Sequence, residues 1–203
     1  MTTGISLHIG LNAVDPTHYQ GWSGQLTACE LDAADMAMIA KSCGFETTTL
    51  LTNTATRNAV IDSIVRCSKT LKSGDIFFLT YSGHGGQVPD SDGDEDDGED
   101  ETWCLFDGQW IDDEIYFHFG SFAEGVRVFV LSDSCHSGTV LRNALFLQAR
   151  THGDTSLSEA AAPYKCMPKS VALRTYLANK KFYDKIGTNA RYHDARAKIK
   201  ASA

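Results

Sequence analysis

Two short apolar runs constrain the fold more than any other feature of this sequence. They are Ile76 to Tyr81 (IFFLTY) and Val126 to Leu131 (VRVFVL). Nearly unbroken apolar runs of this length are typical of strands covered on both faces, and such strands occur mainly in parallel sheets flanked by helices. The two runs therefore predict inner strands of a sheet in an α/β domain.

The remaining patterns alternate between strand and helix along the chain. Before the first apolar run, the predicted elements are a strand over Ile5 to Val14, a helix over Leu26 to Ala40, a strand over Glu46 to Leu51 and a helix over Val60 to Leu71. Between the two apolar runs, they are a hairpin over Trp103 to Ile111 and a helix carrying Ile115, Phe119 and Phe122. This order predicts a mainly parallel sheet with helices on both faces. Ligands of such sheets bind beyond the carboxyl ends of the strands.

The composition fits one globular domain of 203 residues, with 42% hydrophobic and 22% charged residues. No apolar run reaches the roughly 18 to 20 residues of a membrane span. The N-terminus also lacks the basic start and long apolar stretch of a secretory signal. Widely spaced cysteines disfavour a zinc site or a disulfide framework. We therefore expect a cytoplasmic protein with reduced thiols and no membrane partner.

Charge is distributed unevenly along the chain. Nine of the twelve residues from Asp90 to Glu101 are acidic, whereas Pro163 to Ala203 carries ten Lys or Arg against two acids. The acidic stretch has the ligand spacing of a helix–loop–helix calcium site, but Glu95 stands where that loop requires Gly. The basic end lacks an aromatic stacking platform and the net charge is −8, so nucleic-acid binding is not expected. A solvated loop and a solvated helical tail are the simplest interpretations.

Residues with catalytic chemistry follow both apolar runs. His84 lies in SGHGG after the first run, and Cys135 lies in SDSCHSG after the second. If the strands are neighbours, roughly 4.8 Å apart, their carboxyl ends can place this thiol and imidazole together as nucleophile and general base. His136 is the weaker candidate base, because a residue adjacent in sequence usually points elsewhere. The competing interpretation of the bare pair is a structural cysteine and a histidine without a catalytic role.

The two motifs also resemble those of a known family. YSGHGGQ (Tyr81 to Gln87) and SDSCHSG (Ser132 to Gly138) are similar to the histidine and cysteine motifs of caspase-like cysteine peptidases, specifically the metacaspase and orthocaspase branch. The resemblance extends from Ile5 to about Leu141. It implies a caspase-like three-layer α/β sandwich.

The resemblance assigns roles to single residues. It implies Cys135 as the nucleophile, His84 as general base and then acid, and the backbone amides of Gly85 and Cys135 as oxyanion donors. The implied reaction is peptide hydrolysis through an acyl-enzyme, which needs no organic cofactor.

Charge predicts the substrate class. Asp133 lies two residues before Cys135, hence on the same side of its strand, and would face the pocket for the residue before the scissile bond. The resemblance implies that Asp32 completes this pocket, with Cys29 and Ser82 also lining it. Two carboxylates favour a cationic side chain and repel an acidic one, so we expect cleavage after Arg or Lys.

The resemblance further implies a regulatory calcium ion, held by acids that match Asp100, Asp112 and Asp113. Oxygen ligands at this density suit Ca²⁺ and would order the acidic loop. Arg142 departs from this pattern, because many metacaspases carry an acid a few residues after the cysteine motif. The alternative is a loop that serves only solubility.

The C-terminal part departs from the family as well, because no two strong buried strands follow Cys135. We expect a catalytic domain over residues 1–150 and a basic helical segment of the same domain over 151–203. The small-subunit strands would be absent, or supplied by a partner or a homo-oligomer. The strand over Val126 to Leu131 could then be an exposed edge, which chains usually cover. The basic residues Arg174, Lys180 and Lys181 could occupy the acidic pocket in cis and be cut there.

Together these patterns predict a cysteine endopeptidase that cleaves protein or peptide substrates after Arg or Lys, with calcium activation and self-processing as further expectations. The alternative is a catalytically silent caspase-like interaction or regulatory module.

Overall fold

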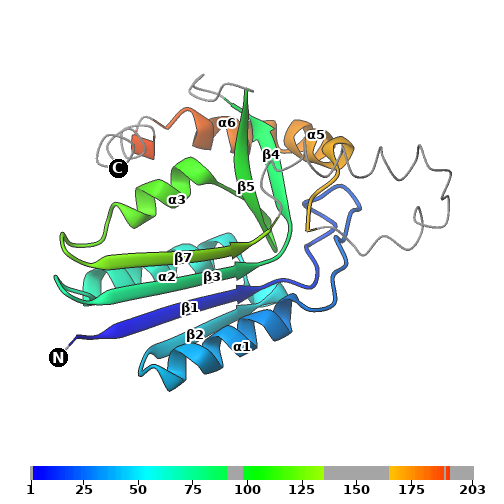
Figure 1. Cartoon of the computed structure of the whole chain (residues 1–203). Coiled ribbons are helices and arrows are strands. Elements are labelled where there is room, and N and C mark those ends of the chain that lie inside the picture. Colours follow the sequence, from blue (N-terminus) through cyan, green and yellow to red (C-terminus); the bar gives the residue numbers. More distant parts are fainter. Residues whose placement is uncertain (1, 91–97, 135–164, 190, 193–203) are drawn as a thin grey trace, which may run out of the picture.

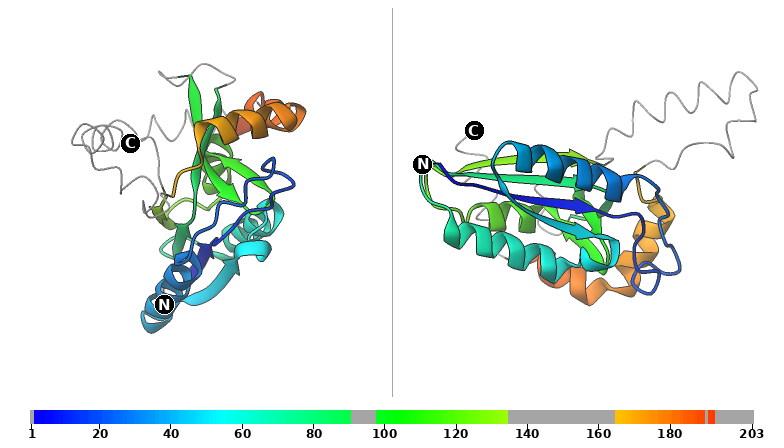
Figure 2. Two further views of the ribbon diagram at one scale, coloured as in Figure 1. Left: turned by 90° about the vertical axis from the view of Figure 1, so that its right-hand side faces the viewer. Right: turned by 90° about the horizontal axis from the view of Figure 1, so that it is seen from below.

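The computed structural model describes residues 2–90, 98–134, 165–189 and 191–192. Its largest sheet has four parallel strands in the order β2-β1-β3-β7. These are β1 (Gly4–Gly10), β2 (Glu46–Leu51), β3 (Ile76–Ser82) and β7 (Arg127–Asp133). Helix α1 (Cys29–Ser42) lies on one face, and α2 (Arg57–Thr70) and α3 (Asp112–Phe119) lie on the other (Figures 1 and 2). The predicted α/β class and layer order are confirmed.

The first strand is shorter than predicted. It ends at Gly10 instead of Val14, because the chain then leaves the sheet with the Leu11 amide donating to the Ser82 carbonyl. Gly10 lies directly under the start of α1, where an added Cβ would stand 2.2 Å from the Cys29 carbonyl oxygen. Only glycine permits so close an approach of helix and strand.

Helix α1 begins three residues later than predicted, at Cys29. The side chain of Asn12 fixes this start: its Oδ1 accepts hydrogen bonds from the amides of Cys29 (3.0 Å) and Glu30 (3.4 Å). These are amides that have no partner within the helix, so an acceptor from outside the helix stabilises its first turn. Gly44, with φ of +86°, follows the helix and allows the turn into β2.

The main apolar core lies between the sheet and the helices α2 and α3. Leu79 and Tyr81 of β3 pack there with Ile64 of α2, and Phe77 stacks on Phe122 with ring centroids 4.9 Å apart. The α1 side of the sheet is more polar. His8 on β1 is fully buried there, and its ring nitrogens each lie 2.9 Å from a hydroxyl, those of Thr80 and Ser6.

Strand β7 is the edge strand expected if no small-subunit strands follow, although its apolar sequence alone is typical of a covered strand. It forms one edge of the described sheet, and Phe129 and Leu131 are 56% and 45% exposed. The Phe129 ring lies beside that of Phe78 on β3, with centroids 5.3 Å apart. An unpaired strand edge of this kind is usually covered in a complete protein.

A second, antiparallel sheet stands at the carboxyl end of the first. It contains β4 (Gly85–Pro89), β5 (Glu99–Leu105) and β6 (Gly108–Ile111), in that order. Strands β5 and β6 form the predicted hairpin, whereas β4 was not predicted. Tyr81 joins the two sheets by stacking on Trp103, with ring centroids 4.4 Å apart.

Two helices complete the described chain: α5 (Lys169–Ala178), which packs against β4, and α6 (Lys180–Gly187). They lie near the end of the molecule at which the large sheet meets the small one (Figure 1). A buried ion pair joins α2 to α3, with Arg57 Nη2 at 2.8 Å from Glu114 Oε2. Within the described residues, no helix combines the length and the apolar character needed to cross a membrane.

Candidate active site

The predicted site lies where β3 and β7 end side by side. Parallel pairing places Ser82 opposite Asp133 in the register of these strands, and His84 follows two residues after Ser82. The sequence expectation of neighbouring strands is therefore confirmed. Cys135 and His136 lie outside the described residues, which end here at Ser134. The pairing of Cys135 with His84 stays a prediction.

His84 is buried and held by one hydrogen bond. Its Nε2 lies 3.0 Å from the carbonyl oxygen of Gly24. A carbonyl only accepts, so Nε2 carries the proton and Nδ1 of the neutral ring presents its lone pair. Nδ1 is buried with no hydrogen-bond partner among the described residues. Nδ1 of His84 is thus the nitrogen that can accept a proton.

The surroundings of His84 keep its ring neutral. Burial is the main cause that lowers the pKa of His84 to about 4; the hydrogen bond to the Gly24 carbonyl opposes this shift, and the positive charge of Lys165 contributes to it. The ring also contacts Trp22, with centroids 4.8 Å apart. At neutral pH this imidazole is therefore an unprotonated base in a fixed tautomer.

The segment that holds His84 depends on a left-handed glycine. Gly24 has φ of +53°, and a Cβ there would stand 2.9 Å from the Trp22 ring and 3.0 Å from His84 Cδ2. The same segment is anchored by Tyr19, whose hydroxyl donates to the Leu105 carbonyl at 2.7 Å. A side chain at position 24 would displace the carbonyl that orients the base.

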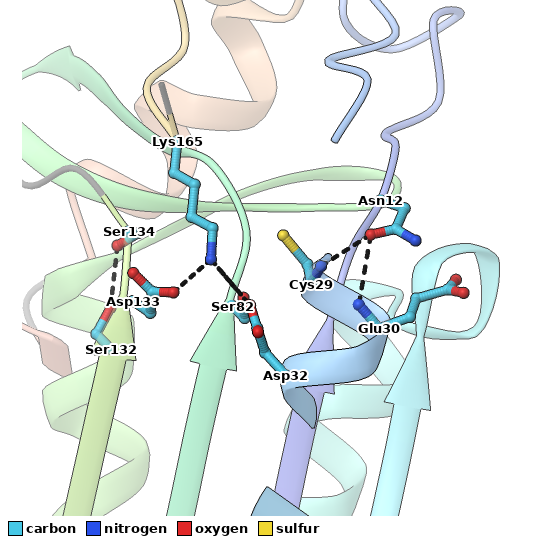
Figure 3. A network of polar contacts seen from close by, with 9 residues as sticks. All are labelled: Asn12, Cys29, Glu30, Asp32, Ser82, Ser132, Asp133, Ser134 and Lys165. Atoms are coloured by element: carbon cyan, nitrogen blue, oxygen red, sulfur yellow. Dashed lines mark hydrogen bonds and ion pairs between the residues drawn. The ribbon is translucent and has the colours of Figure 1, made fainter. Parts of the chain in front are cut away.

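Three residues from three elements form an acidic pocket beside His84. Asp32 comes from α1, Ser82 from β3 and Asp133 from β7, and Ser82 Oγ donates to Asp32 Oδ2 at 2.7 Å. The predicted pocket members are therefore brought together. Figure 3 shows that a cation already stands between them, the ammonium of Lys165.

Lys165 contacts every polar member of this pocket. Its Nζ lies 2.7 Å from Ser82 Oγ and 3.1 Å from Asp32 Oδ2, and it forms a short ion pair with Asp133 Oδ2. The side chain of Lys165 is 20% exposed, whereas those of Asp32 and Asp133 are 42% and 68% exposed. The two carboxylate side chains are thus more exposed to solvent than the lysine that lies between them.

The charges in the pocket reinforce each other. The hydrogen bond from Ser82 lowers the pKa of Asp32, and the bond and charge of Lys165 lower it further, against a smaller effect of burial. Burial lowers the pKa of Lys165, but the hydrogen bonds to Asp133 and Asp32 together outweigh burial and raise it overall. At neutral pH the pocket therefore holds the charged ammonium of Lys165 beside the charged carboxylate of Asp32.

Cys29 lines the same pocket as a neutral thiol. It is 1% exposed, at the first turn of α1, and lies close to Ser82 (Figure 3). Burial raises the pKa of Cys29, although the hydrogen bond between Cys29 and Ser82 and the charge of Lys165 lower it. The Cys29 side chain therefore lines the pocket as a neutral thiol and is not a reactive thiolate.

The backbone around Lys165 is also ordered by the site. The Gly85 amide donates to the Lys165 carbonyl at 2.9 Å, and the Met167 amide donates to the Gly85 carbonyl at 2.8 Å. Gly85 and Cys166 thus form a parallel bridge. The amide predicted as an oxyanion donor is the one that binds the Lys165 carbonyl.

Lys165 is the site residue that sequence reasoning missed. The cationic candidates for this pocket were Arg174, Lys180 and Lys181, of which Lys180 instead pairs with Asp184 on its own helix at 2.6 Å. The acidic residues of the pocket predict that a cationic side chain binds there. No sequence pattern near Lys165, however, distinguishes it from the other basic residues of the C-terminal part.

The predicted calcium ligands Asp100, Asp112 and Asp113 all belong to the described residues, and their role as metal ligands stays a prediction. Asp100 and Asp113 are 1% and 2% exposed, at β5 and at the first turn of α3. Within residues 2–90, 98–134, 165–189 and 191–192, no three His, Cys, Asp or Glu side chains are grouped to hold a metal ion. Arg142 and part of the acidic loop lie outside these residues. The predicted calcium site therefore stays a prediction.

Comparison with known proteins is consistent with this geometry. Metacaspase-1A of Neurospora crassa is 37% identical over 151 residues, which are 67% of this chain and 32% of that protein. Metacaspase-1 of Saccharomyces cerevisiae is 35% identical over 67% of this chain and 34% of its own length. The chain thus spans about a third of these curated relatives.

A solved structure matches over more of the chain. The crystal structure of protein GSU0716 from Geobacter sulfurreducens is 58% identical, with a TM-score of 0.78, over 91% of this chain and 64% of that one. The profile described as metacaspase, peptidase C14 domain, matches residues 6–144, which include both the histidine and the cysteine motif. The chain therefore belongs to the metacaspase family of C14 cysteine peptidases.

Proposed function

We propose that this chain is a cysteine endopeptidase that cleaves after Lys or Arg, with Cys135 and His84 as its catalytic residues. One observation carries the specificity: the ammonium of Lys165 bonded to Asp32, Ser82 and Asp133. A pocket that holds one lysine side chain in this way will accept another of the same charge and length. An acidic side chain would meet two carboxylates there and be repelled.

The tautomer of His84 supports its role as the base. With Nε2 donating to Gly24, Nδ1 is free to take the proton of the Cys135 thiol. The thiolate then attacks the carbonyl carbon of the substrate. Charge develops on the carbonyl oxygen, where the Gly85 amide donates a hydrogen bond.

The second half of the reaction returns each group to its starting state. His84 gives its proton to the leaving amine, and the acyl group stays on Cys135 as a thioester. Water, deprotonated by Nδ1 of His84, attacks the thioester carbonyl and releases the acid product. No metal or organic cofactor enters these steps.

Turnover of short fluorogenic peptides tests the proposal. Peptides with Arg or Lys before the fluorophore should be cleaved far faster than peptides with Asp at that position. Cys135→Ala should abolish cleavage, whereas Cys43→Ala, at an exposed cysteine of α1's C-terminal end, should leave it unchanged. Cleavage of the Asp peptide alone would overturn the assignment of the pocket, and no cleavage of any peptide would favour the silent module.

Calcium activation stays a prediction. It rests on the family and on the acids at Asp100, Asp112 and Asp113, and no catalytic step above is routed through a metal. The same assay tests it when calcium is titrated against a chelator. A rise in turnover that Asp113→Asn reduces would support these ligands, and an unchanged rate would leave the acidic loop a solubilising segment.

Partners beyond substrates are proposed from the edge of the sheet. The relatives are longer than this chain, and β7 is an exposed edge of the described sheet. We propose that further strands, or a second protein chain, cover that edge in the active assembly. Sedimentation of the full chain, with Phe129→Ser as a test of this edge, measures self-association directly.

A further inference from the structure

We infer that Trp22 is a positioning residue for His84: its indole ring holds the imidazole in the orientation in which Nε2 meets the Gly24 carbonyl. The inference deepens the proposed function and rests on it only for the effect on turnover. Trp22 belongs to the segment between β1 and α1, and its ring lies against that of His84, with centroids 4.8 Å apart and planes inclined at 57°.

The hydrogen bond to Gly24 cannot fix the imidazole alone. Nε2 lies 3.0 Å from the Gly24 carbonyl oxygen, and the buried Nδ1 has no hydrogen-bond partner among the described residues. One hydrogen bond fixes a distance and a direction but leaves the ring plane free to tilt. Trp22 limits that tilt because its indole lies against both partners: a Cβ added at Gly24 would stand 2.9 Å from Trp22 Cη2 and 3.0 Å from His84 Cδ2.

The place of Trp22 is set without His84. The Trp22 amide donates to the Tyr19 carbonyl at 3.1 Å, and the indole meets the Tyr19 ring edge-on, with centroids 5.9 Å apart. Tyr19 itself is fully buried. The Val14 amide donates to the Ser23 carbonyl at 2.9 Å and so closes the segment behind the indole. Because none of these contacts involves the imidazole, the indole positions His84 and not the reverse.

Helix α6 anchors the same segment through His18. Nε2 of His18 lies 2.6 Å from the Tyr183 hydroxyl, and Asn179 Nδ2 donates to the His18 carbonyl at 3.2 Å. The Gln109 amide donates to the Tyr183 hydroxyl at 3.2 Å, so that hydroxyl is free to donate its proton to His18. The segment that carries Trp22 is therefore fixed by the small sheet and by α6.

The indole of Trp22 is uncharged and acts on His84 by packing. Lys165 is the charged group that acts on the imidazole. Two further neighbours bind the backbone carbonyl of His84: the Tyr81 hydroxyl at 2.7 Å and the Cys104 amide at 2.9 Å. Burial is the main cause that lowers the pKa of His84 to about 4, and Trp22 is an aromatic side chain that contacts the ring. A substitution of Trp22 therefore tests the packing against the imidazole by itself.

NMR of the full chain with isotope-labelled histidine tests the inference. His84→Gln identifies the signals of His84 by their loss. In the parent, the nitrogen shifts should show a neutral ring with its proton on Nε2. Trp22→Leu should raise the pKa of His84 toward its ordinary value of 6.5, by more than about one pH unit, because water then reaches the charged form. The nitrogen shifts should also move toward those of a ring that exchanges between its two tautomers.

Two further variants make the test specific. Trp22→Phe keeps an aromatic ring that covers less of the imidazole, so it should give a pKa of His84 between those of the parent and Trp22→Leu. Gln25→Ala is the matched control, since Gln25 is an exposed residue of the same segment, next to Gly24, and it should leave the pKa and the tautomer unchanged. If Trp22→Leu does not fold in a urea titration, Trp22→Phe decides.

Equal values for His84 in the parent and in the folded Trp22 variant would overturn the inference. So would a change of the same size in Gln25→Ala. Under the proposed function, Trp22→Leu should also lower kcat for Lys peptides by about tenfold or more with little change in KM, because the base is misaligned while the acidic pocket is intact. The acid limb of kcat/KM should move to higher pH with the pKa of His84.

The outcomes separate this inference from the proposed function. If the parent cleaves Lys peptides while the pKa and tautomer of His84 are the same in Trp22→Leu, the inference is wrong and the proposed function stands. If no peptide is cleaved by the parent while His84 responds to Trp22→Leu as expected, the proposed function fails and the positioning of His84 by Trp22 stands.

Discussion

Two clusters in this molecule hold a basic side chain against carboxylates, and they differ in what surrounds them. Arg57 and Glu114 are joined inside the protein, with side chains 9% and 4% exposed, and Arg57 also donates to the Gln109 carbonyl. In the pocket, Asp32 and Asp133 remain open to solvent, and their lysine arrives from a segment 133 and 32 residues away.

The difference separates a structural contact from a binding site. The buried cluster connects elements whose positions depend on it, and neither partner can reach water without opening the core. In the pocket, α1, β3 and β7 position Asp32, Ser82 and Asp133, whereas Lys165 belongs to a segment outside these elements. The exposed fraction of the carboxylate side chain, more than the distance between the charges, distinguishes the structural ion pair from the proposed binding pocket.

The largest expected effect is at the buried cluster. Glu114→Gln leaves Arg57 buried without a counter-charge, so the free energy of unfolding should fall by about 3–5 kcal/mol. Urea unfolding followed by tryptophan fluorescence measures this. The double variant Arg57→Met with Glu114→Leu should recover part of the loss, because it removes both charges. A single variant as stable as the parent would mean that the cluster is not structural.

Acid sensitivity should also come from buried groups instead of the pocket. Burial lowers the pKa of His8 to about 4, below the ordinary value of 6.5. The unfolded chain then binds more protons than the folded one between these values, so stability falls as the pH is lowered through that window. His8 alone should cost about 2 kcal/mol between pH 8 and pH 5. The variant His8→Gln should show a correspondingly shallower loss in urea titrations at the two pH values.

In the pocket the expected effect is on turnover. Asp32→Asn and Asp133→Asn should each lower kcat/KM for Lys peptides by about 10- to 100-fold, with the free energy of unfolding changed by less than about 1 kcal/mol. Steady-state kinetics in a Lys165→Gln background, where no internal lysine competes, measure this. Asp35→Asn, an exposed acid of the same helix, is the control. A loss of stability as large as that of Glu114→Gln would erase the contrast between the two clusters.

The smallest effect is expected at the surface pair of Lys169 and Glu99. Lys169→Gln should change the free energy of unfolding by less than about 0.5 kcal/mol, because the lysine is mostly solvated and salt screens the pair. The same unfolding titration resolves it. A decrease of more than about 1 kcal/mol in the free energy of unfolding would show that exposure does not predict how much an ion pair stabilises this protein.

The sequence predicted the parts of the fold that depend on local periodicity. The strand over Glu46–Leu51 has the predicted bounds, and β3 extends the predicted run by one residue, to Ser82. Helix α2 buries Val60, Ile64 and Cys67, as their spacing indicated. Repeated apolar positions report which face is buried, so these elements could be predicted without knowledge of their neighbours.

Contacts between distant segments could not be predicted in the same way. The Asn12 side chain that starts α1, the Gly24 carbonyl that orients His84 and the lysine in the pocket each depend on one residue meeting another far along the chain. A single polar residue carries no periodicity. The expected place of Asp32 came instead from the family resemblance, and the expected place of Asp133 from its position near Cys135. The roles of Cys135 and of the calcium ligands stay predictions.

The close approach of α1 to Gly10 makes the proposed preference of the pocket for a cationic substrate depend on packing inside the protein. The first turn of α1 carries Asp32 and rests on β1 at a distance that leaves no room for one methyl group. Any larger residue at position 10 would lift that turn and move one carboxylate away from the other two pocket members. Preference for a cationic substrate could therefore be retuned by a change in the core, at a position that no substrate ever touches.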